Sequence, residues 1–424
     1  MRRSPTFQRP ALVLSSLLVV LPAAALAAGD AAPGTIITRS NRDAYTEILP
    51  PSVQNMLDLG MKIEVNEAAS CPWPKAFRDA TDKYAKDVTL NADRKGLGGY
   101  VAGMPFPTIN PDDPAAAWKV MWNHEHKPAF SDDVRTEWVV ENQDPSGVIE
   151  KMLSSDVWRR LKWEGRIVQQ PLPVIPHNPA IRYTEQWGPI QTPFDLIGTS
   201  FLLYRYEEAT KADDSWLYLP QLRRVRRYST ADRSGTLFGS DIDQDSIWGF
   251  NSKPEWWDFR LLGQKEVLVP MHAGKYATED VWCDSKGTAS WVPCVKWEKR
   301  KVWVIEGRPT LLKVYAFSMR HLWIDAEVFN VSTSEMFDKR EELWKVWQNV
   351  FWCATSVREG RKYPDPRLFT PAVAVIDFQL SHSSRITPPG PQNPLRYDWM
   401  FETGTESDNT PDFYTISSLV SSAK

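Results

Sequence analysis

The sequence predicts a β-rich α+β protein built on one large, curved and mostly antiparallel sheet. Two observations support this fold class. From about residue 131 onwards, extended apolar runs follow one another, with Gly, Pro, Asn and Asp at the turns between them. Before residue 131 the chain shows helical spacing and irregular stretches instead. We therefore expect a mixed helical and irregular segment over residues 28–130 and a sheet domain over residues 131–424.

Residues 1–27 have the features of a cleaved signal peptide. Three arginines precede an apolar run over residues 11–21, and Ala25-Leu26-Ala27 gives the A-x-A spacing that signal peptidase cleaves. The apolar run is shorter than the roughly 20 residues that a membrane-spanning helix needs. We therefore expect export to the periplasm of a Gram-negative bacterium, and a mature chain that is not an integral membrane protein.

Two helices are expected in the segment 28–130. The first begins at Pro74 and places Phe77, Ala80 and Tyr84 on one face. The second opens at Asp112-Asp113-Pro114, where an acidic cap precedes a proline in the first turn, and it ends before Pro128. Its apolar stripe consists of Ala115, Trp118, Met121 and Trp122.

A series of extended runs is expected to form the sheet. Some are apolar on both faces, as in Trp216-Leu217-Tyr218-Leu219, and such a strand needs cover on both sides. The Pro-rich stretch 387–394 is expected to be a surface connection before the C-terminal tail. The runs cover residues 136–142, 158–169, 199–207, 215–220, 225–230, 260–267, 302–307, 321–330, 342–350 and 372–382.

The composition argues against several classes of function. The formal net charge is −3 over 424 residues, whereas nucleic-acid-binding domains are usually strongly basic, so no nucleic acid partner is expected. The sequence carries no G-x-S-x-G elbow, Walker loop or G-x-G-x-x-G motif. It therefore lacks the motifs that usually indicate a hydrolase or a nucleotide-binding protein. The 20 tryptophans are far more than an average chain carries. Tryptophan supplies core burial and also lines pockets for lipids, sterols and sugars.

Four cysteines follow the signal peptide, an even number that permits pairing in an oxidising compartment. Cys283 and Cys294 flank a loop that contains Lys286-Gly287, so a disulfide across a hairpin is expected there. Closing so short a loop contributes about 3 kcal/mol or less. The sequence leaves open whether Cys71 and Cys353 also pair.

An unusually basic strand carries Arg224 and Arg226 on the same face. At the rim of a hollow, two arginines can hold an anionic head group, because guanidinium groups form bidentate bonds to carboxylate and phosphate. The alternative, which we favour, is that the arginines pair with Asp241, Asp243 and Asp245 in a structural network, since buried charge needs pairing.

No metal ion, cofactor or catalytic residue is expected. The three aspartates resemble the start of a calcium loop, but an EF-hand needs Gly at its sixth position and Glu at its twelfth, where this chain has Ser246 and Ser252. His124-Glu125-His126 lacks the spacing of H-E-x-x-H, so the two histidines cannot bind zinc from one helix face.

The run Trp216-Leu217-Tyr218-Leu219-Pro220, the basic strand after it and Gly239-Ser240-Asp241 together resemble a family signature. The family consists of exported proteins related to the LolA/LolB-type outer-membrane lipoprotein-sorting carriers. The chain further resembles a longer, functionally uncharacterised Gram-negative branch over nearly all of its mature length. The segments that carry this second resemblance are 49–53, 60–62, 73–76, 99–107, 110–114 and 267–270.

This resemblance implies a strongly curved antiparallel half-barrel, LolA/LolB-like, covered by helices and hollow on its apolar inner side. Such carriers hold acyl chains in the hollow, and an RND-type exporter and an outer-membrane protein are the implied partners. The large N-terminal segment departs from the short carriers and would plug, cover or extend the hollow. We take as ligand-binding candidates Tyr204, Trp216, Leu217, Tyr218, Leu219, Arg224, Arg226 and Trp344.

Three functions follow from the sequence. The first is a non-catalytic periplasmic carrier or chaperone for a lipid-like ligand, which an apolar hollow with few ionisable groups would favour. The second is an envelope scaffold working with an exporter, which a filled hollow and an exposed apolar patch would favour. The third is a hydrolase acting on glycans or hydrophobic esters, which two facing carboxylates in an open cleft would favour.

Overall fold

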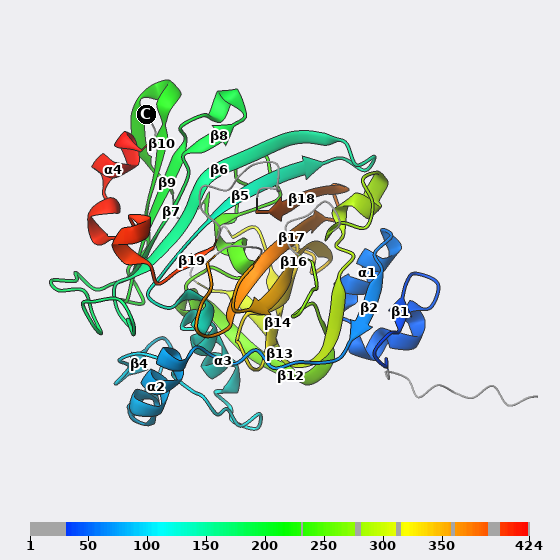
Figure 1. The fold of residues 1–424 in the computed structure, drawn as a ribbon, viewed down its shortest axis with the longest axis horizontal. Coiled ribbons are helices and arrows are strands. Elements are labelled where there is room, and N and C mark those ends of the chain that lie inside the picture. The colour runs from blue at the N-terminus through cyan, green and yellow to red at the C-terminus, as the bar shows by residue number, and fades with distance from the viewer. Residues whose placement is uncertain are drawn as a thin grey trace, which may run out of the picture.

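A computed structural model describes residues 31–229, 232–275, 281–310, 315–357, 361–388 and 399–422 (Figure 1). The predicted signal peptide and most of the Pro-rich connection lie outside these residues. Most strands belong to one 17-stranded sheet, and few helices accompany it. None of the helices in the described ranges is both long and apolar enough to cross a membrane.

The sheet is a continuous series of antiparallel neighbours. Its order is β11-β10-β9-β7-β6-β5-β18-β17-β16-β15-β14-β13-β12. Strand β8 adds to β6, β19 adds to β5, and the pair β1–β2 joins β13, with β2 and β13 parallel. The described strands show no pairing between the outer strands β11 and β12, so the sheet is open.

The first half of these strands has the bounds β1 Ile36–Ile37, β2 Ile63–Asn66, β5 Asp133–Gln143, β6 Ile149–Lys162, β7 Ile181–Trp187, β8 Ile190–Thr192, β9 Ser200–Tyr206, β10 Asp214–Leu219 and β11 Arg224–Arg227. The second half has the bounds β12 Trp257–Val269, β13 Lys296–Pro309, β14 Met319–Asp325, β15 Val331–Phe337, β16 Leu343–Ala354, β17 Arg367–Asp377, β18 His382–Thr387 and β19 Met400–Phe401. A separate hairpin pairs β3 Thr89–Leu90 with β4 Leu97–Gly98.

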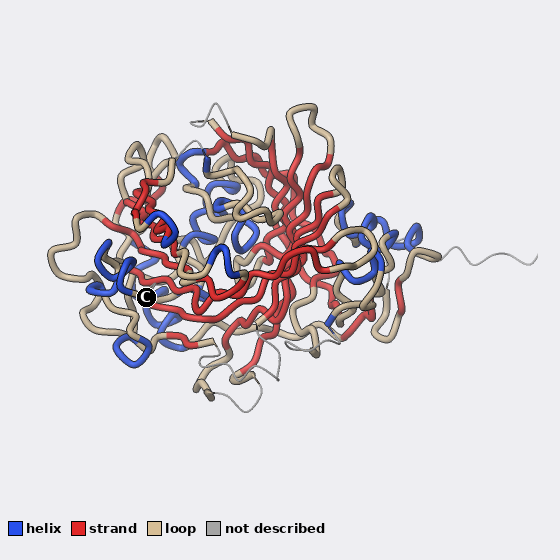
Figure 2. The backbone as a smooth tube through the Cα atoms, turned by 90° about the horizontal axis from the view of Figure 1, so that it is seen from above, coloured by secondary structure: helices blue, strands red, loops and turns tan. Residues whose placement is uncertain are grey.

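The sheet curves around its own loops. Strands β5 and β6 run as long arcs in Figure 1, and Figure 2 shows helical turns and loops within the curve of the strands. Register shifts interrupt the ladder, for example between Leu261 and Gly263 of β12, and such bulges bend and twist a strand. The predicted β-rich α+β fold, a curved antiparallel half-barrel, is confirmed.

The helices are α1 Pro51–Asp58, α2 Lys75–Tyr84, α3 Ala116–Glu125 and α4 Ile416–Ser421. The two predicted N-terminal helices correspond to α2 and α3, and α1 was not predicted. Helix α3 packs its Trp118 edge-to-face on Phe259 of β12, at 5.1 Å between ring centroids. Helix α4 lies against β9 and β10 at the other end of the sheet (Figure 1).

Three predicted strands extend at least five residues too far, because aspartate side chains hold the chain in a turn where the pattern still looks extended. The run 158–169 ends at Lys162, and the Asp132 carboxylate accepts the N–H groups of Ile167 and Val168 at 2.7 Å each. The runs 321–330 and 372–382 end at Asp325 and Asp377, whose carboxylates each accept two N–H groups of the following turn. Aspartate favours this geometry through its short acceptor side chain.

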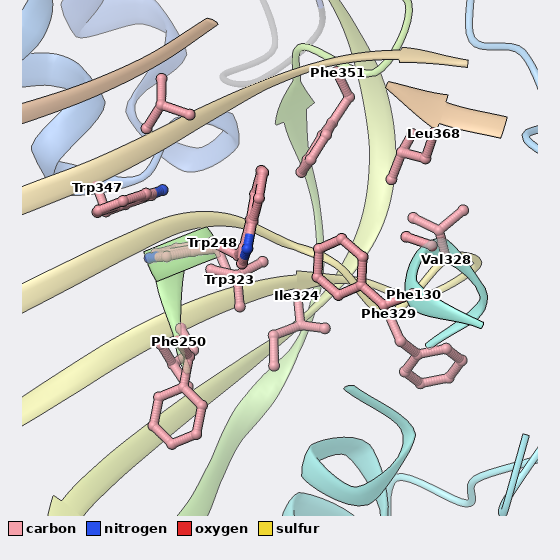
Figure 3. Close-up of a cluster of buried hydrophobic side chains, with 14 of the residues drawn as sticks. Phe130, Trp248, Phe250, Trp323, Ile324, Val328, Phe329, Trp347, Phe351 and Leu368 are labelled. Atoms are coloured by element: carbon pink, nitrogen blue, oxygen red, sulfur yellow. The ribbon is translucent and has the colours of Figure 1, made fainter. Parts of the chain in front are cut away.

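The inner side of the curve is filled by loops as well as by strand side chains. Residues 233–256, between β11 and β12, bring Trp248 against Phe130 from the loop after α3, and against Trp138 and Trp158 of β5 and β6. Ring centroids in these pairs lie 4.9–5.3 Å apart, in edge-to-face arrangements. Figure 3 shows Trp248 and Phe130 in a larger cluster of buried apolar side chains. The many tryptophans of the sequence therefore form a large part of the core.

Two disulfides are present. Cys283–Cys294 closes the short hairpin that the sequence predicts. Cys71–Cys353 spans 282 residues and joins the chain before α2 to strand β16. Together with the parallel pairing of β2 and β13, this bridge ties the N-terminal segment to the sheet.

Removing the long bridge should cost more stability than removing the short one. The chain-entropy relation gives roughly 6 kcal/mol for Cys71–Cys353 and roughly 3 kcal/mol for Cys283–Cys294. The double substitutions Cys71→Ser with Cys353→Ser, and Cys283→Ser with Cys294→Ser, are compared by urea unfolding. Equal losses in the two variants would contradict an anchoring role for the long bridge.

Candidate functional site

A cavity of about 120 Å³ lies on the inner side of the sheet, between β5–β8, β16–β18 and the loop before β12. Its lining combines fourteen apolar side chains with three serines. The apolar members are Trp138, Val140, Leu153, Trp158, Trp187, Ile190, Leu237, Phe238, Ile242, Ile247, Trp248, Trp347, Val373 and Ile386. No titratable side chain belongs to this lining, as far as the described residues go.

One wall of the cavity is a row of side chains that crosses four strands. Val373 of β17 is opposite Ile386 of β18, Ile386 is opposite Val140 of β5, and Val140 is opposite Leu153 of β6. Directly opposed residues of antiparallel strands point to the same face. Because successive side chains of a strand point to opposite faces, each of these four strands places an aliphatic side chain in the cavity wall.

The three serines of the lining satisfy their hydroxyl groups within the protein. Ser240 Oγ donates to the carbonyl of Leu237 at 2.7 Å, and Ser155 Oγ donates to the carbonyl of Val157 at 3.0 Å. Ser154 Oγ lies 2.6 Å from Thr192 Oγ. Because these hydroxyls already have partners, the cavity offers a ligand an essentially apolar surface.

The opposite wall is the loop that carries Asp241, Asp243 and Asp245. Its aspartates are buried and point into the protein, while the intervening Ile242 and the following Trp248 line the cavity. This alternation explains how one short, acidic stretch forms an apolar wall. The aspartates anchor the loop in the protein, and its apolar side chains point into the cavity.

Each aspartate has partners from distant elements. Asp241 accepts hydrogen bonds from Ser384 Oγ at 2.9 Å and lies 2.7 Å from His382 Nδ1, both on β18. The bond to Asp241 raises the pKa of His382. Asp243 lies 3.6 Å from a guanidinium nitrogen of Arg320 on β14.

Asp245 forms the innermost part of this network. It accepts a hydrogen bond from Tyr315 Oη at 2.7 Å and one from Arg233 Nε at 3.0 Å. Arg233 also donates to Asp213 at 2.8 Å, and Asp213 is paired with Arg205 of β9 at 2.9 Å. All of these charged groups are buried and paired.

The structure corrects the predicted partners of the aspartates. They do form a structural network, but with Arg233, Arg320 and His382, none of which the sequence analysis proposed. Arg224 and Arg226 lie on the edge strand β11 and are exposed. Neither the aspartates nor other groups of three His, Cys, Asp or Glu are placed to hold a metal ion in the described ranges.

The eight predicted ligand-binding residues lie outside the cavity lining. Tyr204, Trp216 and Tyr218 face α4 and pack with Tyr414 and Leu419. The side chain of Tyr204 donates to the carbonyl of Tyr414.

The remaining candidates lie on the other face or elsewhere in the sheet. Leu217 is opposite Phe201, which packs on Trp187 of the cavity lining. Leu219 and Leu217 are opposite Arg224 and Arg226, which places both arginines on the same face as Leu217. Trp344 of β16 donates to Asp377 at 2.8 Å and packs on Phe317.

Part of the lining had a sequence signal and part did not. Trp138 and Val140 alternate within the predicted strand 136–142, so their common face was predictable. Trp187, Ile190 and Phe238 lie in segments for which no element was predicted. Trp187 ends β7 and Ile190 begins β8, two strands that were not predicted, and Phe238 lies in the loop before β12.

A second cluster contains two carboxylates. Glu164 and Glu207 are hydrogen-bonded to each other beside Arg182, which pairs with Glu207 at 2.7 Å. Burial, followed by the charge of Glu207, raises the pKa of Glu164 to about 8. Glycosidase carboxylates stand about 5 Å or more apart with the substrate between them, whereas this pair is in direct contact. The arrangement therefore provides no space for a glycosidic bond.

Replacing Glu164 with Gln should remove one contribution to the pH dependence of stability. Unfolded glutamate titrates near pH ~4.3, so between about pH 5 and 8 the folded protein keeps a proton that the unfolded chain has released. The contribution of Glu164 to the unfolding free energy should therefore fall as the pH rises, by at most about 1.4 kcal/mol per pH unit, and level off above the folded pKa.

The measurement is urea unfolding across this pH range. The matched control is Glu208→Gln, an exposed neighbour, which should retain the slope of the unaltered protein. The same slope in Glu164→Gln as in the unaltered protein would show that another group binds the proton.

Comparison with known proteins gives a family and several distant relatives. The family model described as "Protein of unknown function (DUF1329)" matches residues 36–419. An uncharacterized protein of Pseudomonas aeruginosa, PA3922, is 23% identical over 387 residues, which cover 88% of this chain and 79% of the relative. The resemblance to an uncharacterised family is thereby confirmed.

The solved structures to which the chain is similar are more distant in sequence. A putative outer membrane lipoprotein-sorting protein domain from Vibrio parahaemolyticus has 17% identity and a TM-score of 0.48, covering 71% of this chain and 97% of its own. A DUF1329 family protein from Desulfovibrio piger has 17% identity and a TM-score of 0.43, covering 68% and 92%. The LolA superfamily protein NE2245 from Nitrosomonas europaea has 11% identity and a TM-score of 0.37, covering 67% and 92%.

Proposed function

The chain belongs to the DUF1329 family, whose function is unknown, and we propose that it is a periplasmic carrier or chaperone. It binds part of a lipid-like molecule in the inner cavity of its sheet and catalyses no reaction. Transfer of the ligand between the two envelope membranes, with an RND-type exporter and an outer-membrane protein as partners, is the part of the proposal that rests on the sequence resemblance.

The observation that carries the proposal is the chemistry of the cavity lining. Fourteen apolar side chains surround the space, and the three serine hydroxyls beside them are already hydrogen-bonded. Moving a methylene group from water to such a surface gains about 0.8 kcal/mol. An acyl segment can therefore be held without a charged partner or a covalent bond.

The size of the cavity limits the ligand. A space that holds one water takes roughly 10–15 Å³ by the same measure, so 120 Å³ has room for about eight waters or more. This volume suits a segment of an acyl chain or a fused ring system. A complete phospholipid would need the surrounding loops to move.

The same lining argues against catalysis at this site. Acid–base and nucleophilic mechanisms need a titratable group within hydrogen-bond reach of the substrate. The lining contains no such group among the described residues, and its serines have no histidine or carboxylate beside them in the lining. The carboxylate pair Glu164–Glu207 lies outside it.

Native mass spectrometry of protein isolated from periplasm without detergent tests the proposal, combined with lipid extraction and uptake of a fluorescent fatty acid. We expect a co-purified lipid or sterol near one per chain, or saturable uptake of the probe. A protein that is empty and takes up no fatty-acid or phospholipid probe would contradict the carrier and favour the envelope scaffold.

Filling the cavity should weaken uptake of the fatty acid while leaving the fold intact. Val140→Trp places an indole in the cavity, because Val140 is a partly exposed residue of the lining. Val139→Trp is the matched control, since its neighbour in the same strand has a similar exposure and points to the other face. We expect at least about a tenfold weaker affinity for the fluorescent fatty acid in Val140→Trp only, as loss of two or more buried methylenes gives. Equal affinities in the two variants would place the probe elsewhere.

A further inference from the structure

The end of the sheet next to β8 and β10 exposes a group of large apolar side chains. Phe194 is 90% exposed, Ile197 is 46% exposed and Leu222 is 49% exposed. Phe194 and Ile197 come from the short turn after β8, and Leu222 comes from the turn after β10. The side chain of Gln221 donates to the carbonyl of Asp195, so the two turns lie side by side. We call Phe194, Ile197 and Leu222 the apolar tip.

Three arginines follow the apolar tip directly. Arg223, Arg224 and Arg226 are exposed, and no carboxylate of the described chain forms an ion pair with any of them. Their neighbour Arg227 differs, because it pairs with Asp214. The tip itself carries one acid, Asp195, which is exposed in the turn after β8. The surface therefore combines protruding apolar groups with uncompensated positive charge.

We propose that this surface docks the protein on an anionic phospholipid bilayer. Phe194, Ile197 and Leu222 enter the interfacial layer, and Arg223, Arg224 and Arg226 bind the lipid phosphates. An arginine near an anionic membrane surface strengthens binding about fivefold, and its planar guanidinium can contact phosphate in a bidentate manner. Apolar insertion and a basic cluster are two separate signals, and stable membrane binding needs both.

The shape of the surface favours a bilayer over a protein or a second copy of the chain. The apolar side chains protrude from two turns and do not line a groove into which a peptide could fit. A stable protein interface buries about 800 Å² per partner around a packed apolar centre. Three protruding side chains beside a strip of like charges provide a bilayer anchor instead.

Charged residues on an edge strand also protect it from pairing with other strands. That role explains arginines on β11 but not the exposure of Phe194 and Leu222, which would increase association. Only the apolar tip distinguishes the two explanations. The experiment therefore varies the tip and the arginines separately.

Docking would bring the proposed cavity close to the bilayer. Strand β8, which precedes Phe194, contributes Ile190 to the cavity lining. Arg226 is opposite Leu217, which packs in the same cluster as the lining residue Trp187. The docking proposal does not depend on the proposed carrier function, because the empty protein should bind vesicles.

The test is flotation of the full mature chain with vesicles. One set contains about 30% phosphatidylglycerol in phosphatidylethanolamine, and the other contains phosphatidylcholine alone. We expect binding to the anionic vesicles that falls when the salt rises from roughly 0.1 M to 1 M, since screening shortens the Debye length about threefold. Arg223→Gln with Arg224→Gln and Arg226→Gln should weaken binding on the order of a hundredfold. Phe194→Ser with Ile197→Ser and Leu222→Ser should weaken it at least about tenfold.

Two control variants match these changes elsewhere on the surface. The first replaces the exposed lysines Lys62, Lys86 and Lys301 with Gln and removes the same charge. The second is Leu380→Ser, at a side chain that is 72% exposed after β17. Both should bind vesicles as the unaltered protein does.

Two results would overturn the proposal. One is equal binding to anionic and zwitterionic vesicles, and the other is unchanged binding in the arginine or the tip variant. If the protein binds vesicles but takes up no fatty-acid probe, the result supports the docking proposal and contradicts only the carrier proposal. Circular dichroism of each variant confirms that it is folded, which surface positions should allow.

Discussion

The rest of the structure depends on the pairing of buried charges along the loop that fills the curve of the sheet. Arg205, Asp213, Arg233 and Asp245 form a chain of ion pairs that runs from strand β9 to the centre of the molecule, and Tyr315 completes it. A buried ion that loses its partner costs several kcal/mol, so each pair constrains the segments that carry it. The loop must therefore adopt one path across the inner face.

That path explains why the molecule has a cavity in a particular place. A curved sheet of this length has an inner face too large for its own side chains to cover. The loop brings Trp248 into the aromatic core beside Phe130, Trp138 and Trp158 and closes part of the space. What remains is the volume between Trp248, Ile242 and the row of aliphatic residues that crosses β17, β18, β5 and β6. One side of the loop forms the polar network, and its other side forms a wall of the apolar cavity.

The same division separates the two parts of the proposed function. The proposed ligand binding uses the apolar inner face, which has no ionisable group in its described lining. The proposed membrane docking uses the outer end of β8, β10 and β11, where the arginines and the apolar tip are exposed. Strand β8 joins them, with Ile190 in the lining and Phe194 at the tip only four positions later.

The sequence by itself determined the fold class, the two helices α2 and α3, most of the strands and the hairpin disulfide. These features follow from short-range patterns: alternation along a strand, a proline or acid at a helix start, and a nearby pair of cysteines. The family resemblance extended this to a curved, open sheet. Strand ends were less predictable, because the aspartates that terminate them act through side-chain bonds to the following turn.

Only the tertiary structure decided which residues meet. The sequence placed Trp216 and Tyr218 among the ligand-binding candidates, but α4, more than 190 positions later in the chain, covers their face. The prediction from sequence paired the aspartates with the wrong arginines, because Arg320 is distant in sequence and adjacent in space. The sequence left the partner of Cys71 open for the same reason, since 282 residues separate Cys71 from Cys353. Alternation fixes which residues share a face, but the path of the loops fixes what that face contacts.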